Sequence, residues 1–158
     1  MLDQDFDAVV AAPGFSLGVR CNGEALTEIA WLPPRPEQAG TSPLASETAR
    51  QLEAYLADPA FQFDLPLVTP GTHFRRRVWQ AIAAIPTGEV RTYGELARAL
   101  SSSPRAVGQA CGDNPVPIVV PCHRVVAASG ALGGFAHNRS GMMLDVKRWL
   151  LTHEGCPR

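Results

Sequence analysis

The sequence predicts an α+β protein of two lobes, a small N-terminal α/β lobe over 1–69 and a mostly helical C-terminal lobe over 70–158. Strand-like apolar runs gather in the first part of the chain, and helix-capping residues follow one another in the second. Charge divides at the same place. Residues 1–70 hold three arginines and ten acids, for a net charge of −7, whereas residues 71–158 hold eleven basic residues and five acids, for +6. We therefore predict a linker at 66–70, which begins and ends with proline.

The N-terminal lobe is predicted to hold a β-hairpin followed by a helix. The runs 15–20 and 25–32 are rich in strand formers, and Asn22-Gly23 between them suits a tight hairpin turn. A helix is predicted over 46–56, where apolar residues recur on one face, and a further strand over 61–67. This part of the chain contains no chemical motif, so we expect it to act as a scaffold.

Capping residues predict the helices of the second lobe. Thr72 can cap a helix that Pro86 and Gly88 end, and Thr92 can cap a second helix over 93–100. Each of these threonines precedes a run with apolar residues at helical spacing.

A third short helix completes a helix-turn-helix pattern. Ser103 is a suitable N-cap and Pro104 a suitable first residue for a helix that runs to Cys111, where Gly112 is expected to stop it. The turn 101–103 separates this helix from the one before it. A last helix is predicted over 141–154. Its buried face is expected to hold Met142, Val146, Trp149, Leu150 and His153.

An apolar run with a Pro-Cys-His-Arg step, over 115–126, carries the clearest chemistry. We predict a strand that leads to Cys122. A thiol beside the imidazole of His123 is a nucleophile with a candidate base. Neighbouring strand residues point to opposite faces, however, and a buried cysteine is usually a small core residue. The Cys-His pair alone therefore leaves both interpretations open.

Segments on both sides of this step form a wider pattern. They read Gly-Glu-Val-Arg-Thr-Tyr-Gly-Glu-Leu-Ala (88–97), Arg-Ala-Val-Gly-Gln-Ala-Cys-Gly-Asp-Asn-Pro (105–115), Ser-Gly-Ala-Leu-Gly-Gly-Phe (129–135) and Lys-Arg-Trp-Leu-Leu-Thr-His-Glu-Gly (147–155). With the Pro-Cys-His-Arg-Val step, they closely resemble the O6-alkylguanine-DNA alkyltransferases, also called methylated-DNA–protein-cysteine methyltransferases. The resemblance covers 70–155, and the first 65 residues match only loosely. It implies an RNase H-like N-terminal lobe and a winged helix-turn-helix in the second.

The resemblance implies DNA repair by direct transfer of the alkyl group of O6-alkylguanine to Cys122, with O4-alkylthymine as a further candidate substrate. The base must leave the stack to be reached. Because a thioether has no easy leaving reaction, each molecule acts once and is consumed. No metal or organic cofactor is implied, and the expected partner is double-stranded DNA, bound through the minor groove by a monomer.

The resemblance also assigns the catalytic residues. His123 corresponds to the base and Glu154 to the glutamate that orients it. Asn114 corresponds to the asparagine that fixes the turn before the nucleophile. Tyr93 corresponds to the tyrosine that pushes the target's phosphate and bonds the guanine ring.

DNA contacts are implied for the helix after Ser103. Arg105 corresponds to the arginine that fills the hole left by the flipped base, while Ala106 and Gly108 let the helix come close to DNA. The alternative is that these small residues permit close packing on a neighbouring helix. Arginine favours forked hydrogen bonds and stacking, and ten of the eleven basic residues of this half are arginines, which favours a phosphate partner.

Val125, Pro117 and Phe135 are implied to line the substrate pocket. Two segments depart from the family pattern. The turn 101–103 is shorter than usual, and the loop 136–143 after Phe135 is longer, which leaves its residues unassigned by register.

Other functions stay open on the sequence: a non-catalytic alkyltransferase-like binder of damaged DNA, a helix-turn-helix regulator, and a cysteine hydrolase. Four cysteines without regular metal spacing, no signal peptide and no apolar run of 18 residues indicate a reducing compartment, the cytoplasm or a nucleus, and no membrane partner. Cys21 and His73 are two scattered residues and weak evidence for zinc.

Overall fold

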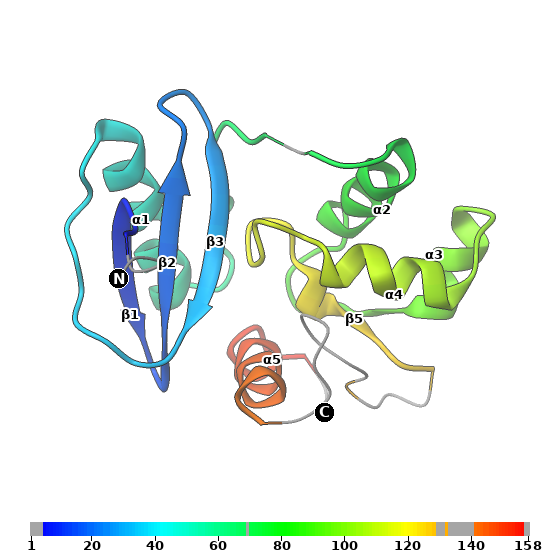
Figure 1. The fold of residues 1–158 in the computed structure, drawn as a ribbon. Helices are drawn as coiled ribbons and strands as arrows, with labels where there is room; N and C mark the ends of the chain where they lie inside the picture. The colour runs from blue at the N-terminus through cyan, green and yellow to red at the C-terminus, as the bar shows by residue number, and fades with distance from the viewer. Residues whose placement is uncertain (1–4, 69, 129–131, 133–140, 157–158) are drawn as a thin grey trace. The chain divides into compact units, whose positions relative to one another are not determined.

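The computed structural model describes residues 5–68, 70–128, 132 and 141–156. It divides into two compact units, residues 1–69 and residues 70–158 (Figure 1). The predicted α+β class is confirmed, because the first unit contains a sheet with a helix and the second is mostly helical. In the part of the chain that the structure describes, no helix has the length and apolar character needed to cross a membrane.

The first unit is built on an antiparallel sheet in the order β1-β2-β3. The predicted hairpin is confirmed as β2 (Phe15–Cys21) and β3 (Leu26–Leu32), joined by a turn in which Asn22 Oδ1 accepts hydrogen bonds from the backbone N of Glu24 and Ala25. Strand β1 (Ala8–Ala12), which pairs with β2, is missing from the sequence prediction.

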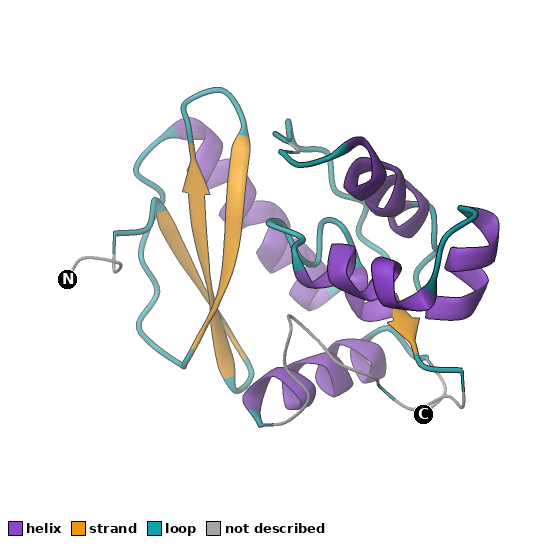
Figure 2. Ribbon diagram, turned by 45° about the vertical axis from the view of Figure 1, so that its right-hand side comes forward, coloured by secondary structure: helices purple, strands orange, loops and turns teal. Residues whose placement is uncertain are grey.

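Helix α1 (Pro43–Ala57) packs on this sheet (Figure 2). It begins before the predicted residue 46, because Ser42 caps it and accepts a hydrogen bond from Ala45 N at 3.1 Å. The predicted strand over 61–67 is wrong. The side chain of Gln51 bonds both backbone groups of Asp64, at 2.9 and 3.0 Å, and only an isolated bridge forms there, between Leu26 and Leu67.

The second unit contains the predicted helices α2 (His73–Ala83), α3 (Tyr93–Ala99) and α4 (Pro104–Gly112). Their predicted caps are present. Thr92 forms a capping box with Glu95, and Ser103 Oγ accepts from Ala106 N at 3.1 Å. α4 includes Gly112 and has Asp113 as its C-cap, so the predicted stop is one residue early.

Helices α3 and α4 pack against each other and form the predicted helix-turn-helix (Figure 1). In the short turn between them, Ser101 has a φ of 54°, in the left-handed region. α2 packs on α4 as well, and Trp79 Nε1 donates to the carbonyl of Ala110 at 2.8 Å. The wing, like the RNase H-like lobe, stays a prediction.

The predicted strand before Cys122 is wrong. Residues 116–120 form turns, in which Val120 N donates to Val116 O at 3.0 Å and Ile118 has a φ of 74°. A short 3-10 helix, η2 (Cys122–Arg124), follows. The strand is confined to β5 (Val125–Val126), which pairs in parallel with β4 (Arg91–Thr92).

Helix α5 (Met142–His153) ends at its C-cap Glu154, and Gly155 follows with a φ of 76°. Its predicted buried face is partly wrong. The buried side chains are Val146, Lys147, Leu150 and Leu151. Met142 is 36% exposed, and the rings of Trp149 and His153 stack on each other with centroids 4.7 Å apart.

Candidate active site and nucleic-acid interface

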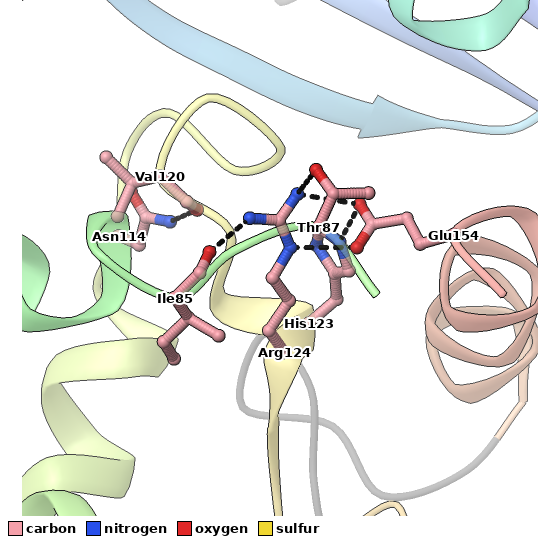
Figure 3. A network of polar contacts seen from close by, with 7 residues as sticks. All are labelled: Ile85, Thr87, Asn114, Val120, His123, Arg124 and Glu154. Atoms are coloured by element: carbon pink, nitrogen blue, oxygen red, sulfur yellow. Dashed lines mark hydrogen bonds and ion pairs between the residues drawn. The ribbon is translucent and has the colours of Figure 1, made fainter. Parts of the chain in front are cut away.

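Cys122 is held at the start of η2 by one amide side chain. Asn114 Nδ2 donates to Cys122 Sγ at 3.2 Å and to Val120 O at 2.9 Å, while its Oδ1 accepts from Val116 N at 3.0 Å (Figure 3 shows the bond to Val120). These bonds take the place of a strand ladder, because the side chain occupies backbone groups that a neighbouring strand would need. Asn114 therefore fixes the turn and contacts the sulfur atom.

The surroundings of Cys122 favour its protonated thiol. A hydrogen bond with the side chain of Cys111, and then burial of the thiol, which is 4% exposed, raise the pKa of Cys122 well above its ordinary value of 9.0. The hydrogen bond from Asn114 and the charge of Lys147 act in the opposite direction and are weaker.

His123 and Glu154 are in direct contact. His123 Nε2 lies 2.7 Å from Glu154 Oε2, and both side chains are buried (Figure 3). Burial lowers the pKa of His123, and the carboxylate of Glu154 only partly offsets it. A neutral imidazole beside a carboxylate carries its proton on the nitrogen that faces the carboxylate. Nε2 therefore donates to Glu154, and Nδ1 keeps an available lone pair.

His123 Nδ1 is buried and makes no hydrogen bond within the described structure. Buried polar atoms are seldom left unsatisfied, and such an atom usually marks a water or a functional group that is still to be accounted for. This nitrogen is thus free to accept a proton.

Arg124 also binds the carboxylate of Glu154. Its Nε and Nη2 donate to Glu154 at 2.8 and 3.1 Å, and its Nη1 donates to Ile85 O at 2.6 Å (Figure 3). Nη2 also donates to Thr87 Oγ1 at 3.2 Å. The arginine cation balances the buried carboxylate, and the two together fix Glu154 against His123.

Sequence reasoning missed Lys147, which is fully buried at 0% exposure. Its Nζ donates to Val125 O at 2.8 Å and to Leu132 O at 2.5 Å, and lies 5.8 Å from the centre of the Tyr93 ring. The structure thereby links Tyr93 to the segment after Cys122. The signal in the sequence was that Lys147 is the single lysine among the basic residues of this half.

Helix α4 presents its first turns to solvent. Arg105 is exposed, Ala106 and Gly108 are half-buried, and a β-carbon at Gly108 would meet no atom within 4 Å. Packing inside the described structure therefore does not require glycine at 108, against the alternative that small residues serve a helix-helix contact there.

The structure describes two of the three residues predicted to line the pocket. Val125 and Pro117 are buried, and Phe135 and residues 136–140 lie outside the described residues. Within the described chain, no His, Cys, Asp and Glu side chains are grouped in threes or more as a metal site requires.

Comparisons with known proteins agree on one family. Residues 73–156 match the family described as 6-O-methylguanine DNA methyltransferase, DNA binding domain. The methylated-DNA–protein-cysteine methyltransferase of Methanosarcina acetivorans is 50% identical over 111 residues, which cover 69% of this chain and 68% of that protein. The counterpart of Mycolicibacterium paratuberculosis is 49% identical over 106 residues, 66% of this chain and 61% of that one.

A solved structure extends the likeness to nearly the whole chain. The crystal structure of Mycobacterium tuberculosis OGT in complex with DNA has a TM-score of 0.75 and 37% identity, and the match covers 94% of this chain and 93% of that one. The chain belongs to the 6-O-methylguanine DNA methyltransferase family.

Proposed function

We propose that this protein repairs DNA by moving the alkyl group of O6-alkylguanine irreversibly to Cys122. The observation that carries the proposal is the arrangement around the buried sulfur. Asn114 Nδ2 donates to Cys122 Sγ at 3.2 Å. His123, which follows Cys122 in the chain, is oriented by Glu154, whose Oε2 lies 2.7 Å from His123 Nε2. A nucleophile, a base and a group that orients the base are the parts that nucleophilic attack needs.

In this proposal Cys122 attacks the alkyl carbon as a thiolate. The sulfur-carbon bond forms as the bond between the alkyl carbon and guanine O6 breaks. His123 Nδ1 accepts the thiol proton through a bridging water, and the proton leaves with the guanine. Glu154, which Arg124 holds in place, stabilises the imidazolium that forms meanwhile, and the charge of Lys147 favours the thiolate. Because a thioether has no easy leaving group, each molecule reacts once.

DNA is bound by the helix-turn-helix in the minor groove. A helix about 10 Å across is wider than a normal minor groove of about 6 Å, so the groove has to widen. The small side chain of Ala106 and the absence of one at Gly108 reduce the widening that is needed. Arg105, which is exposed, enters the base stack in place of the flipped base. Tyr93 pushes the target's phosphate and bonds the guanine ring, next to the cation of Lys147.

Val125, Pro117 and Phe135 are proposed to line the pocket for the extruded base. The protein acts as a monomer on double-stranded DNA, in the compartment that holds the DNA, the cytoplasm of a bacterium or the nucleus of a eukaryote. O4-alkylthymine is the second substrate to test, because it presents an alkylated oxygen to the same thiol.

The decisive experiment is mass spectrometry after mixing with duplex DNA that contains O6-methylguanine. The protein is expected to gain about 14 Da, one methyl group in place of one hydrogen, and no more with excess DNA. Fragmentation should place the methyl group on Cys122, and Cys122→Ala should bind the duplex without gaining mass. A parent protein that binds the damaged duplex and stays unmodified would instead be a non-catalytic binder.

A further inference from the structure

The last turn of α4 is held from outside the helix by Trp79 of α2. The final carbonyls of an α-helix find no N–H partner inside the helix and have to be satisfied by other groups. Here the backbone N of the C-cap residue donates to Gln109 O and Cys111 O. The carbonyl between them, that of Ala110, accepts from Trp79 Nε1 at 2.8 Å. A side chain of α2 therefore completes the C-terminal end of α4.

Trp79 is the stronger of two attachments between α2 and this helix end. Its side chain is 4% exposed and belongs to the buried face of α2, with Val78 and Ile82. One turn earlier, Arg75 Nη2 pairs with Asp113 Oδ2 at 2.7 Å. That ion pair is partly open to solvent, and such pairs contribute little. Loss of the indole N–H, in contrast, leaves a buried carbonyl without this hydrogen bond.

The same helix end leads into the residue that contacts the sulfur of Cys122. Asn114 follows the C-cap of α4, and its backbone N donates to Cys111 O at 3.3 Å. Its Nδ2 donates to Cys122 Sγ at 3.2 Å and to Val120 O at 2.9 Å. Asn114 is only four residues beyond Ala110, so a shift of the last turn of α4 displaces the amide from the sulfur atom.

We propose that Trp79 is a positioning residue for the alkyl transfer, because it fixes the end of α4 and thereby holds the Asn114 amide against Cys122. A hydrogen bond to the sulfur favours its charged form, so an amide that leaves the sulfur slows the attack. The effect on the reaction rests on the proposed function, whereas the placement of Asn114 by Trp79 does not.

Trp79→Phe tests the proposal, because it removes the indole N–H and keeps an aromatic ring. The reaction with a free benzylated guanine base should slow about tenfold, the scale of one lost buried hydrogen bond. Urea unfolding checks that the variant is folded under the assay conditions. The control Trp31→Phe removes an indole N–H from β3 in the first unit and should react at the parent rate. A parent rate in folded Trp79→Phe overturns the proposal.

A double-mutant cycle separates positioning from general stability. Asn114→Ala should also slow the reaction with the free base. Adding Trp79→Phe to Asn114→Ala should then change the rate by less than about twofold, because the amide that Trp79 places is already gone. If Trp79→Phe lowers the rate by the same factor in both backgrounds, Trp79 does not act through Asn114 and the proposal is wrong.

Hydrogen exchange provides a readout that needs no alkyl transfer. The backbone N of Val116 donates to Asn114 Oδ1 at 3.0 Å, so its exchange reports on the placement of this side chain. In Trp79→Phe this amide should exchange about tenfold faster. The backbone N of Val107, which donates to Ser103 O at 3.1 Å in the first turn of α4, should keep its parent rate. Unchanged exchange at Val116, or equal acceleration at both amides, contradicts the proposal.

The exchange measurement also covers the loss of a variant. If Trp79→Phe does not fold, Trp79→benzothienylalanine is measured in the same way, since its ring has the same shape with sulfur in place of the N–H. If Asn114→Ala does not fold, the two amides of the Trp79 variant still decide. A parent protein that fails to react with the free base would refute the proposed function, and the exchange rates would still test the placement of Asn114.

Discussion

Replacing Gly108 with alanine separates what α4 needs to fold from what it needs to bind DNA. Gly108 lies in the middle of α4 (Pro104–Gly112), and a β-carbon there would meet no atom within 4 Å. The new methyl group therefore causes no clash in the free protein. Because alanine has a higher helix propensity than glycine, the free energy of unfolding should rise by about 1 kcal/mol.

DNA binding should change in the opposite direction. If α4 enters the minor groove, the space beside Gly108 is the space that DNA occupies, and an added side chain has to displace it. A tenfold loss of duplex affinity corresponds to about 1.4 kcal/mol, which we expect for Gly108→Ala, and Gly108→Leu should lose more. The reaction with a free benzylated guanine base should stay at the parent rate, because a free base does not need the groove.

The assay is fluorescence anisotropy with a duplex at one fixed salt concentration, combined with urea unfolding of the same samples. Gly94→Ala in α3 is the stability control, because its β-carbon would lie in ordinary contact, 3.6 Å from Arg98 Nη1. Parent-like duplex affinity in a folded Gly108→Leu protein would refute the close approach of α4 to DNA.

Three further predictions concern stability. Glu154→Gln should lower the free energy of unfolding by about 3–5 kcal/mol in urea, because the charge of Arg124 stays buried without its carboxylate; a loss below 1 kcal/mol would contradict this. Burial holds the pKa of His123 below its ordinary value of 6.5, so the unfolded chain binds this proton more readily. The free energy of unfolding should therefore fall as the pH drops from 6.5 towards the lowered pKa, and His123→Gln should flatten that part of the profile. Gly40→Ala should lower the free energy of unfolding by about 1–3 kcal/mol, since the new β-carbon would lie 2.5 Å from Ser46 N. If the variant unfolds at the same temperature as the parent, the loop has adapted and the prediction is wrong.

Local signals in the sequence predicted most of the helices correctly. Thr92 and Ser103 cap α3 and α4 as expected, because capping depends on a side chain and a backbone group only three residues apart. The hairpin turn at Asn22 is local for the same reason. The start of α1 was missed because Ser42 caps it ahead of the apolar pattern that marks the helix.

Tertiary contacts explain the failures. The apolar run before Cys122 favours a strand, but Asn114 takes up the backbone groups that a ladder would use, and turns form instead. Lys147 sits in the buried face of α5 because two carbonyls accept from its Nζ, and one of them, from Val125, is 22 residues away in the sequence. A charged residue is normally expected on the surface, so periodicity alone does not predict its burial.

The surroundings of Cys122, the proposed nucleophile, raise the pKa of its thiol. The interaction with Cys111 and burial both raise the pKa of Cys122, which favours the thiol, although a thiolate is required for attack. In the proposed mechanism the proton passes to neutral His123, whose Nδ1 makes no bond in the described structure while Nε2 is engaged with Glu154. We therefore expect removal of the thiol proton to become favourable only when a bridging water and the alkyl carbon are both in the site. The Glu154 carboxylate then stabilises the imidazolium of His123, and the alkyl carbon reacts with the thiolate as it forms. A protein that reacts only once benefits from a thiol that stays protonated until its substrate arrives.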